Sequence, residues 1–357
     1  MAATTFAQRL LRWFDQHRRD LPWRRTRDPW AILVSEIMLQ QTRVEAVQDK
    51  YARFMARYPA PAAFAAIDDD ELLLAWQGLG YYRRARLLRD AARAVIAEHR
   101  GALPRDPDAL GRLPGIGAYT RGAVASIAFG VPVRAVDGNV ERVAARHLAL
   151  RDDIATAPAR RAVAAAVDGW LDPQRPGDFN QALMELGAVV CTPAAPRCER
   201  CPVAADCAGR AQGLAERLPV RKPPRAPIAV TSRCLLVPRR GGVLAFRVPA
   251  GEHNAGQWEL PGPGVLTSVG AGDLAAATAR RCGAAFEVGP ALATVRHAIT
   301  HYRIALVAHA GDVARGRAGT LPTIAPDDPD APWTTVARKV FAAARRACCG
   351  QPPHWLW

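Results

Sequence analysis

Lysine is nearly absent from this chain of 357 residues: only Lys50, Lys222 and Lys339 are lysines, although 48 residues are basic. The stretch between Lys50 and Lys222 therefore has no side-chain primary amine, which excludes Schiff-base catalysis there. The chain also lacks an apolar run approaching the ~20 residues that a membrane span requires, and its N-terminus is amphipathic rather than a secretory signal. We therefore expect a cytoplasmic protein without membrane contact.

The charge balance is strongly basic, with a net charge of +15. Half of the residues are hydrophobic, which excludes a disordered chain. A positive excess of this size favours a polyanionic partner, nucleic acid first. The dominance of arginine is also typical of a GC-rich genome, so by itself it says little about phosphate recognition.

Two domains are expected, separated by a linker over residues 217–228. The run from Arg217 to Pro227 (RLPVRKPPRAP) holds four prolines and four basic residues, a composition typical of an extended linker. Apolar residues before it recur at helical spacing. After it, apolar runs flank Arg239-Arg240-Gly241-Gly242, which predicts a hairpin, Val295–Ala310 is strand-like, and Val336–Ala347 is helical. The fold class is an all-α domain followed by a smaller α+β domain.

Four of the eight cysteines are confined to 17 residues with the spacing C-x6-C-x2-C-x5-C: Cys191, Cys198, Cys201 and Cys207. A reducing cytosol makes metal binding the better interpretation than disulfides. Zinc sites usually combine two short C-x2–4-C knuckles with a longer spacer, whereas this segment has one knuckle. The pattern favours one [4Fe–4S] cluster held by four thiolates, with zinc as the alternative.

The segment Leu113-Pro114-Gly115-Ile116-Gly117 lies between two stretches of helical pattern. Glycines allow close backbone approach, and the amides that enter the second helix form a natural phosphate site. This is the helix–hairpin–helix arrangement, which grips DNA without reading its sequence, although many helix–helix turns also contain glycines. Downstream, Val136-Asp137-Gly138-Asn139-Val140 places a carboxylate at a turn.

Together these elements resemble the helix–hairpin–helix, iron–sulfur DNA glycosylases of the endonuclease III superfamily, and within it the adenine DNA glycosylase (MutY) branch. The resemblance covers residues 5–212. Besides the hairpin and the cysteines, the motifs that carry it are Leu21-Pro22-Trp23-Arg24, Asp28-Pro29-Trp30, Val34-Ser35-Glu36-Ile37-Met38-Leu39-Gln40-Gln41-Thr42 and Gly78-Leu79-Gly80-Tyr81-Tyr82-Arg83-Arg84-Ala85. It implies a glycosylase domain over residues 1–216, in which a six-helix barrel spans residues 29–136 and a cluster subdomain combines 1–28 with 137–216.

The resemblance also assigns the chemistry. It makes Glu36 the general acid that protonates N7 of adenine, and Asp137 the carboxylate that stays ionised and stabilises the sugar cation. Glu36 lies among apolar residues, so we expect burial to raise its pKa. Tyr119 and Asn139 are expected to orient Asp137 and the attacking water. The bifunctional lyases of the superfamily carry a lysine where this chain has Tyr119, so a monofunctional glycosylase is expected.

A base inside a duplex must be flipped out to be reached. By the same resemblance, the residues that wedge into or bind the DNA are Gln40, Gln41, Thr42, Leu79, Tyr81, Gly115 and Gly117. The residues that would line the adenine pocket are Leu21, Trp23, Arg24 and Gln181. Core packing is the alternative role for Trp23, for Tyr81 and for Tyr82.

Residues 229–357 resemble, more weakly, the MutT-like (Nudix-fold) domain of the family, which recognises 8-oxoguanine opposite the adenine. Trp258-Glu259-Leu260-Pro261-Gly262 fits its strand-end motif. Asp273–Ala284 lacks the glutamates that would hold Mg²⁺, so pyrophosphatase activity is disfavoured. The family's Phe-Ser-His recognition loop reads Ile299-Thr300-His301 here: Thr300 and His301 keep a hydroxyl and an imidazole, but the aromatic ring is lost.

The expected function is hydrolytic excision, by a monomer, of adenine opposite 8-oxoguanine or guanine in double-stranded DNA. Two alternatives remain: an endonuclease III-like lyase for oxidised pyrimidines, and a non-catalytic iron–sulfur DNA-binding protein. The missing lysine and the additional C-terminal domain argue against the first alternative. The presence of Glu36 and Asp137 argues against the second.

Overall fold

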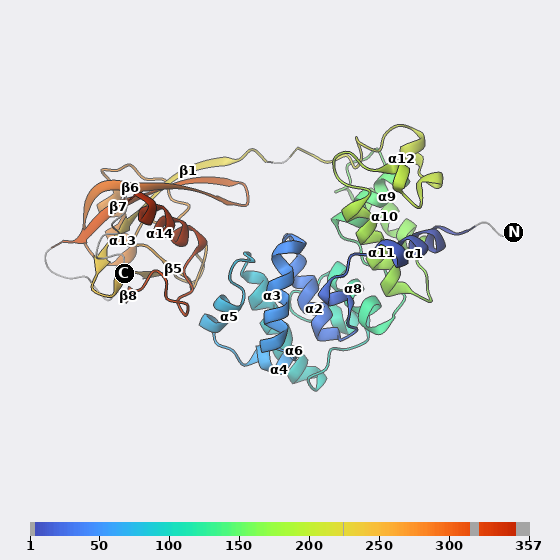
Figure 1. Cartoon of the computed structure of the whole chain (residues 1–357), viewed down its shortest axis with the longest axis horizontal. Coiled ribbons are helices and arrows are strands. Elements are labelled where there is room, and N and C mark those ends of the chain that lie inside the picture. The colour runs from blue at the N-terminus through green and yellow to red at the C-terminus, as the bar shows by residue number, and fades with distance from the viewer. Residues whose placement is uncertain (1–3, 224, 315–320, 348–357) are drawn as a thin grey trace. The chain divides into compact units, whose positions relative to one another are not determined.

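The computed structural model of the chain describes residues 4–223, 225–314 and 321–347 (Figure 1). It divides into two compact units, Met1–Ile67 with Arg83–Pro223, and Asp68–Tyr82 with Pro224–Trp357. The second unit thus begins inside the segment read as a linker, and it also includes a short stretch from the helical half of the sequence. Within the described residues, no helix is long and apolar enough to cross a membrane.

The first unit is helical, as the spacing of its apolar residues predicts. Its α-helices are α1 (Phe6–His17), α2 (Pro29–Leu39), α3 (Val44–Arg57), α4 (Pro61–Ala65), α6 (Arg83–His99), α7 (Pro107–Arg112), α8 (Ala118–Phe129), α9 (Gly138–His147), α10 (Ala157–Trp170), α11 (Pro176–Val189) and α12 (Ala208–Ala211). Its 3-10 helices are η1 (Pro22–Arg24), η2 (Cys198–Arg200) and η3 (Ala204–Asp206). The expected helix–hairpin–helix is confirmed as α7 and α8 with the glycine turn between them.

Polar side chains set the starts of several of these helices. Thr5 and Gln8 form a reciprocal cap at the start of α1, and aspartates accept backbone hydrogen bonds at the starts of α2, α7 and α9. Such caps satisfy amides that the first helical turn leaves without partners. The cap of α9 is Asp137, so the carboxylate that the sequence assigns to the sugar also determines where a helix begins.

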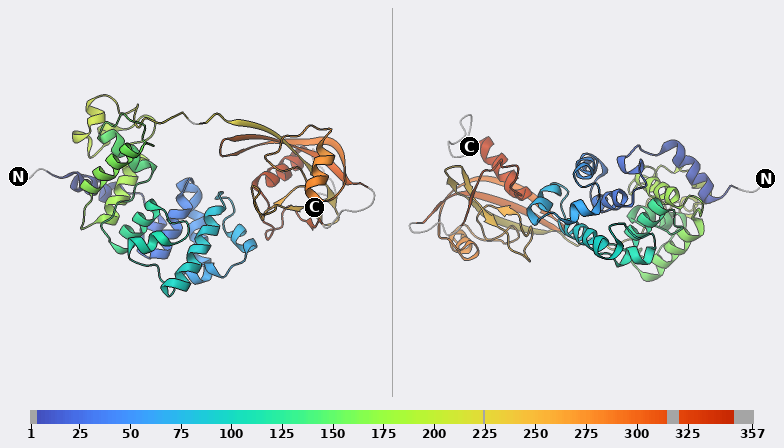
Figure 2. Two further views of the ribbon diagram at one scale, coloured as in Figure 1. Left: turned by 180° about the vertical axis from the view of Figure 1, so that it is seen from behind. Right: turned by 90° about the horizontal axis from the view of Figure 1, so that it is seen from below.

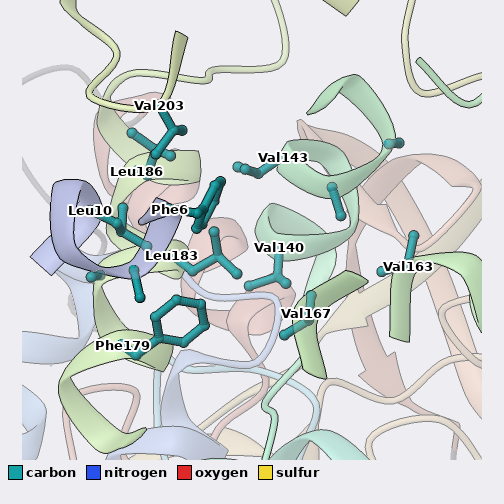
Figure 3. Packing of buried hydrophobic residues seen from close by; sticks show 14 of the residues in the cluster. Phe6, Leu10, Val140, Val143, Val163, Val167, Phe179, Leu183, Leu186 and Val203 are labelled. Atoms are coloured by element: carbon teal, nitrogen blue, oxygen red, sulfur yellow. The ribbon is translucent and has the colours of Figure 1, made fainter. Parts of the chain in front are cut away.

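One hydrophobic core joins α1 to α9, α10 and α11 (Figure 3). Leu10 and Val140 are among its fully buried members, and Val203 brings the cysteine segment into the same core. Gly187 on α11 allows α9 to approach closely, because a Cβ atom there would lie 2.6 Å from the Cβ of Asn139. This packing fixes the start of α9 beside the C-terminal half of α11.

The second unit contains α5 (Asp69–Ala75) and an α+β region, as the change in sequence texture after the linker predicts. Its other elements are β1 (Ile228–Leu236), β2 (Pro238–Arg239), β3 (Gly242–Leu244), β4 (Phe246–Arg247), β5 (Trp258–Glu259), α13 (Leu274–Cys282), β6 (Phe286–Ile299), β7 (Tyr302–Val313), β8 (Thr323–Ile324) and α14 (Thr335–Ala347).

The largest sheet has the order β1-β7-β6, with β1 parallel to β7 and β7 antiparallel to β6 (Figure 2). The predicted hairpin is the pair β2–β3, in which Arg239 lies opposite Gly242, and β8 extends it. Cys234 and Leu236 pack into the core of α14, whereas Leu235 packs with α13. Because side chains alternate along a strand, the two helices cover opposite faces of β1.

Candidate active site

The two carboxylates singled out by the sequence line one cavity of about 690 Å³ in the first unit. Most of the other predicted site residues of that unit line it too: Leu21, Trp23, Arg24, Gln40, Gln41, Thr42, Tyr119, Asn139 and Gln181. They come from η1, the end of α2, the start of α8, the start of α9 and the middle of α11. Residues spread over 161 positions of sequence from Leu21 to Gln181 are therefore brought together by the packing of these helices.

Glu36 lies on α2, and only 6% of its surface is exposed. Burial raises the pKa of its carboxyl group to about 7, and the negative charge of Asp137 acts in the same direction. The Tyr119 hydroxyl donates a hydrogen bond to Oε2 of Glu36, which partly offsets this rise in pKa. A carboxyl group with such a pKa can hold a proton near neutral pH and release it.

Asp137 caps α9 with both carboxylate oxygens engaged. Oδ1 accepts from the amide of Val140 at 2.8 Å, and Oδ2 accepts from Nδ2 of Asn139 at 2.8 Å. Burial raises the pKa of Asp137, while these hydrogen bonds and the charge of Arg142 oppose the rise. Asn139 thus contacts Asp137 as expected, whereas Tyr119, expected at the same carboxylate, bonds to Glu36 instead.

A buried ion-pair cluster was not anticipated from the sequence. Glu185 on α11 has a side chain 1% exposed, and it accepts from Nε and Nη2 of Arg19 and from Nη2 of Arg24, each at 2.8 Å. Although burial alone would raise the pKa of Glu185, these bonds lower it to about 2. The LPWR motif identified Arg24, but nothing in an apolar helix identified Glu185 as its partner.

Trp23 and the turn after α2 shape the wall of the cavity. Trp23 is buried and meets Tyr51 edge-on, with ring centroids 5.5 Å apart, so it is both a core residue and a lining residue. Arg84 donates to carbonyls at the end of α2 and, at 3.1 Å, to Oγ1 of Thr42. This arginine satisfies the last turn of α2 and holds the segment that carries Gln40 and Gln41.

The glycine hairpin has the geometry expected of a close approach. Gly115 has φ +75°, a backbone conformation that strains any residue with a side chain. A Cβ atom there would also lie 2.7 Å from the Cβ of Leu87, too close for contact. Gly117 precedes α8, and a Cβ atom there would meet no other atom within 4 Å. The start of α8 thus has open space beside it, which suits the binding of an anion at a helix N-terminus.

Three predicted DNA-contacting residues adopt the left-handed backbone conformation that non-glycine residues rarely use: Gln41, Tyr81 and Thr300. In the second unit, Tyr81 is 48% exposed, whereas Leu79 is buried. Thr300 lies at the turn between β6 and β7, followed by His301, whose ring is 4.3 Å from that of Tyr302. Backbone strain of this kind often accompanies functional sites.

The four clustered cysteines line a second, smaller cavity together with Arg146, Arg197 and Arg210. Arg146 is buried, and its Nη1 lies 3.3 Å from Sγ of Cys191. Burial raises the pKa of the Cys201 thiol to about 11. Across the described part of the chain, no three His, Cys, Asp or Glu side chains are close enough to share a single metal ion.

Arg142 on α9 connects the two cavities. Its Nε donates to the carbonyl oxygen of Cys191 at 2.8 Å, and its Nη2 donates to Oδ1 of Asn139 at 2.8 Å and to the carbonyl of Gly187 at 2.9 Å. A continuous set of hydrogen bonds therefore runs from the cysteine segment through Arg142 and Asn139 to Asp137.

Comparison with known proteins agrees with this arrangement. Residues 34–169 match the family model of the HhH-GPD superfamily base excision DNA repair proteins. The human adenine DNA glycosylase is 45% identical over 224 residues, 60% of this chain and 41% of the relative. The adenine DNA glycosylase of Mycolicibacterium smegmatis is 45% identical over 207 residues, 57% of this chain and 69% of the relative.

Solved structures of DNA glycosylases are similar to more than half of the chain. A thermostable thymine-DNA glycosylase is 31% identical with a TM-score of 0.53, covering 58% of this chain and 95% of that one. Endonuclease III trapped on DNA is 26% identical with a TM-score of 0.50 and covers 58% and 95%. The chain spans less than half the length of the human relative. On the strength of its similarity to the mycobacterial relative, the chain belongs to the adenine DNA glycosylase family, within the HhH-GPD superfamily of base excision repair proteins.

Proposed function

We propose that this chain is a monofunctional glycosylase that flips adenine out of duplex DNA and hydrolyses its N-glycosidic bond when it is paired with 8-oxoguanine or guanine. The observation that carries the proposal is the pairing, in one cavity, of Glu36, whose pKa is raised to about 7, with Asp137 at the start of α9. Two carboxyl groups in different environments can divide acid catalysis and charge stabilisation between them.

In the proposed reaction, Glu36 donates its proton to N7 of adenine as the C1′–N9 bond breaks, and the electron pair of that bond leaves with the base. Asp137 stabilises the positive charge that develops at C1′. A water molecule then adds its oxygen to C1′ and gives up one proton to a carboxylate. Asn139 positions Asp137, and Tyr119 positions Glu36 through its hydrogen bond.

The adenine pocket would be formed by two apolar walls and two polar contacts. Leu21 and Trp23 offer buried apolar surface, and the Gln181 amide faces the same cavity. Arg24 is held in place by Glu185, so its orientation is set before substrate arrives. Tyr119 stands where a lyase carries its lysine, so strand cleavage is not part of the proposed reaction.

Binding to the duplex would use the hairpin and the strained turns. The amides at Gly115 and Gly117 suit a backbone phosphate, Gln40 and Thr42 border the cavity, and Gln41 would enter the space that the flipped base leaves. Leu79 and Tyr81 would support the opposite strand. Because Leu79 is buried, it would support the turn that carries Tyr81 by packing beneath it.

A [4Fe–4S] cluster is proposed at Cys191, Cys198, Cys201 and Cys207. The four cysteines line one cavity, and four thiolates are the ligand set that a [4Fe–4S] cluster takes. When bound, the cluster would supply the positive charge that a buried thiolate such as Cys201 needs in order to form. The role of these residues would then be to hold the segment that α9 contacts.

The C-terminal region is proposed to read the base opposite the adenine, with Thr300 and His301 at its recognition turn. The exposed backbone turn at Thr300 is a suitable place for such a contact. A magnesium-dependent hydrolase activity is not proposed, because α13 and its flanks (Asp273–Ala284) lack the glutamates that would hold Mg²⁺, and Arg281 on α13 pairs with two glutamates from outside this segment. Its Nη2 donates to Glu252 at 2.7 Å and to Glu259 at 3.2 Å.

A duplex assay tests the proposed function. The full chain is incubated with DNA that holds adenine opposite 8-oxoguanine, adenine opposite guanine, or thymine opposite guanine, and half of each sample is then treated with hot alkali. Strand breaks that appear in the adenine duplexes only after alkali are expected. The absence of base release from both adenine duplexes would reject the proposal, breaks without alkali would establish a lyase, and release of thymine alone would assign the activity of the thymine-DNA glycosylase relative instead.

A further inference from the structure

We infer that Arg221 binds the backbone phosphate that adjoins the extruded nucleotide. Arg221 lies in the segment that the sequence reads as a linker, outside the residues matched by the family model. It nevertheless lines the large cavity of the first unit together with Glu36 and Asp137. The inference rests on the proposed function, since it takes a flipped nucleotide as the occupant of that cavity.

The backbone just before Arg221 is attached to the helical unit. The amide of Ile154 donates to the carbonyl of Val220 at 3.0 Å, and Val220 forms an isolated β-bridge with Asp153. Nε of the buried Arg146 donates to the carbonyl of Leu218 at 2.8 Å. These bonds hold the start of the linker beside α9, so the position of Arg221 is set by the folded unit rather than by a freely moving chain.

The neighbours of Arg221 in the cavity include Gly138 and Asn139, the first two residues of α9. The start of a helix carries partial positive charge, and here a full positive charge is added beside it. Asp137 and Glu36 are the groups proposed to act on the sugar and the base, so a phosphate esterified to that same sugar must lie close to this part of the cavity.

The other cavity arginines are already committed to partners. Arg19 and Arg24 are paired with the buried Glu185. Arg142 donates to three backbone carbonyls and to Asn139. Arg221 faces Glu141 at 3.7 Å, which is longer than a hydrogen bond, and its side chain is 55% exposed.

A loose, exposed ion pair is weak, so Arg221 can exchange Glu141 for a stronger partner. A phosphodiester accepts two hydrogen bonds from the planar guanidinium group, which makes it such a partner. It is also the anion that a flipped nucleotide brings with it. A cation at this point further offsets the repulsion between that phosphate and the carboxylate of Asp137.

The test compares Arg221→Gln with Arg221→Lys and with the matched control Lys222→Gln. Lys222 carries the same charge on the next residue, is exposed, and is not among the residues that line the cavity. Binding is measured with the full chain and a duplex that holds uncleavable 2′-fluoro-2′-deoxyadenosine opposite 8-oxoguanine. In a second set of duplexes, a neutral methylphosphonate replaces one phosphate at a time around that nucleotide.

We expect Arg221→Gln to weaken binding about tenfold and to lower the slope of log affinity against log salt by about 1. Lys222→Gln should weaken binding less. Arg221→Lys, which keeps the charge, should bind more tightly than Arg221→Gln but less tightly than wild type. One methylphosphonate adjoining the nucleotide should weaken wild-type binding about tenfold and leave Arg221→Gln unaffected. The inference is overturned if every methylphosphonate weakens both proteins equally, or if Lys222→Gln reproduces the loss.

Failure of the proposed function is recognised separately, by assaying adenine release from a cleavable duplex with the same preparations. A wild-type protein that releases no adenine rejects the proposed function, whereas the methylphosphonate comparison depends only on binding. A wild-type protein that releases adenine, together with no selective phosphate effect, rejects the inference about Arg221 alone.

Discussion

The side-chain amide of Asn139 donates a hydrogen bond of 2.8 Å to Oδ2 of Asp137. Arg142 donates to the other end of the same amide, Oδ1, at 2.8 Å. A guanidinium group can only donate, so this contact requires the amide oxygen to face Arg142 and the NH₂ group to face Asp137. Asn139 thereby orients Asp137, and Arg142 orients Asn139. Arg142 is in turn held by the backbone carbonyl of Cys191.

Replacement of Asn139 by alanine removes one hydrogen bond from Asp137. Because that bond opposes the effect of burial, we expect the pKa of Asp137 to rise, and the rate of adenine release to fall on the order of 10- to 100-fold. Single-turnover rates measured between pH 5 and pH 8 would show the acidic limb displaced to higher pH. Unchanged binding of the uncleavable duplex is the control, and a uniform loss of rate without displacement would contradict this role.

The raised pKa of Glu36 predicts that activity falls on the alkaline side. The carboxyl group must be protonated to act as an acid, so the rate should decline as the pH rises through about 7. In Tyr119→Phe, the hydrogen bond that lowers the pKa of Glu36 is lost, and the midpoint should move to higher pH. The comparison variant Glu36→Gln should abolish base release at every pH while retaining duplex binding. A midpoint that moves to lower pH in Tyr119→Phe would contradict the assignment.

Glu36 should also lower the stability of the folded protein. Its pKa is about 7 when folded against 4.5 for an ordinary glutamate, so the folded state holds this proton more tightly. Stability is therefore lost as the pH rises from about 4.5 through 7. We therefore expect Glu36→Gln to have a larger free energy of unfolding than wild type. The difference between variant and wild type should be about 2 kcal/mol larger at pH 8 than at pH 5. Urea unfolding at the two pH values measures this difference, and an equal effect at both would remove the ionisation of Glu36 as its cause.

The buried Arg146 is expected to support metal binding, because it holds the backbone of the cysteine segment. Only 2% of it is exposed, and it donates to the carbonyls of Leu218, Thr192 and Pro193. Arg146→Met would leave these acceptors without a partner, at a cost of about 3 kcal/mol or more. We expect a lower melting temperature and a loss of the iron of the proposed [4Fe–4S] cluster, measured by absorbance and metal analysis of the purified protein. Arg197→Met, an exposed residue of the same cavity, should retain both, and retention of full iron by Arg146→Met would refute this role.

The features that could be predicted from the sequence are those set by residues close together in the chain. The hairpin glycines, the turn at Asp137 and the helical spacing of the apolar residues depend on residues close together in the chain, so their patterns can be recognised in the sequence. The division into a helical part and an α+β part was predicted for the same reason, because helical and strand periodicities change within a few residues of the linker.

The tertiary structure decided which residues share an environment. The pKa of Glu36 depends on the helices that exclude water from it, the partner of Tyr119 depends on how α8 meets α2, and Glu185 becomes a site residue only because α11 faces η1. Arg221 enters the cavity because two backbone contacts hold the linker against α9. The sequence alone determined the chemical groups and the helices that carry them, whereas burial, charge pairing and convergence arise from long-range packing, which no local pattern contains.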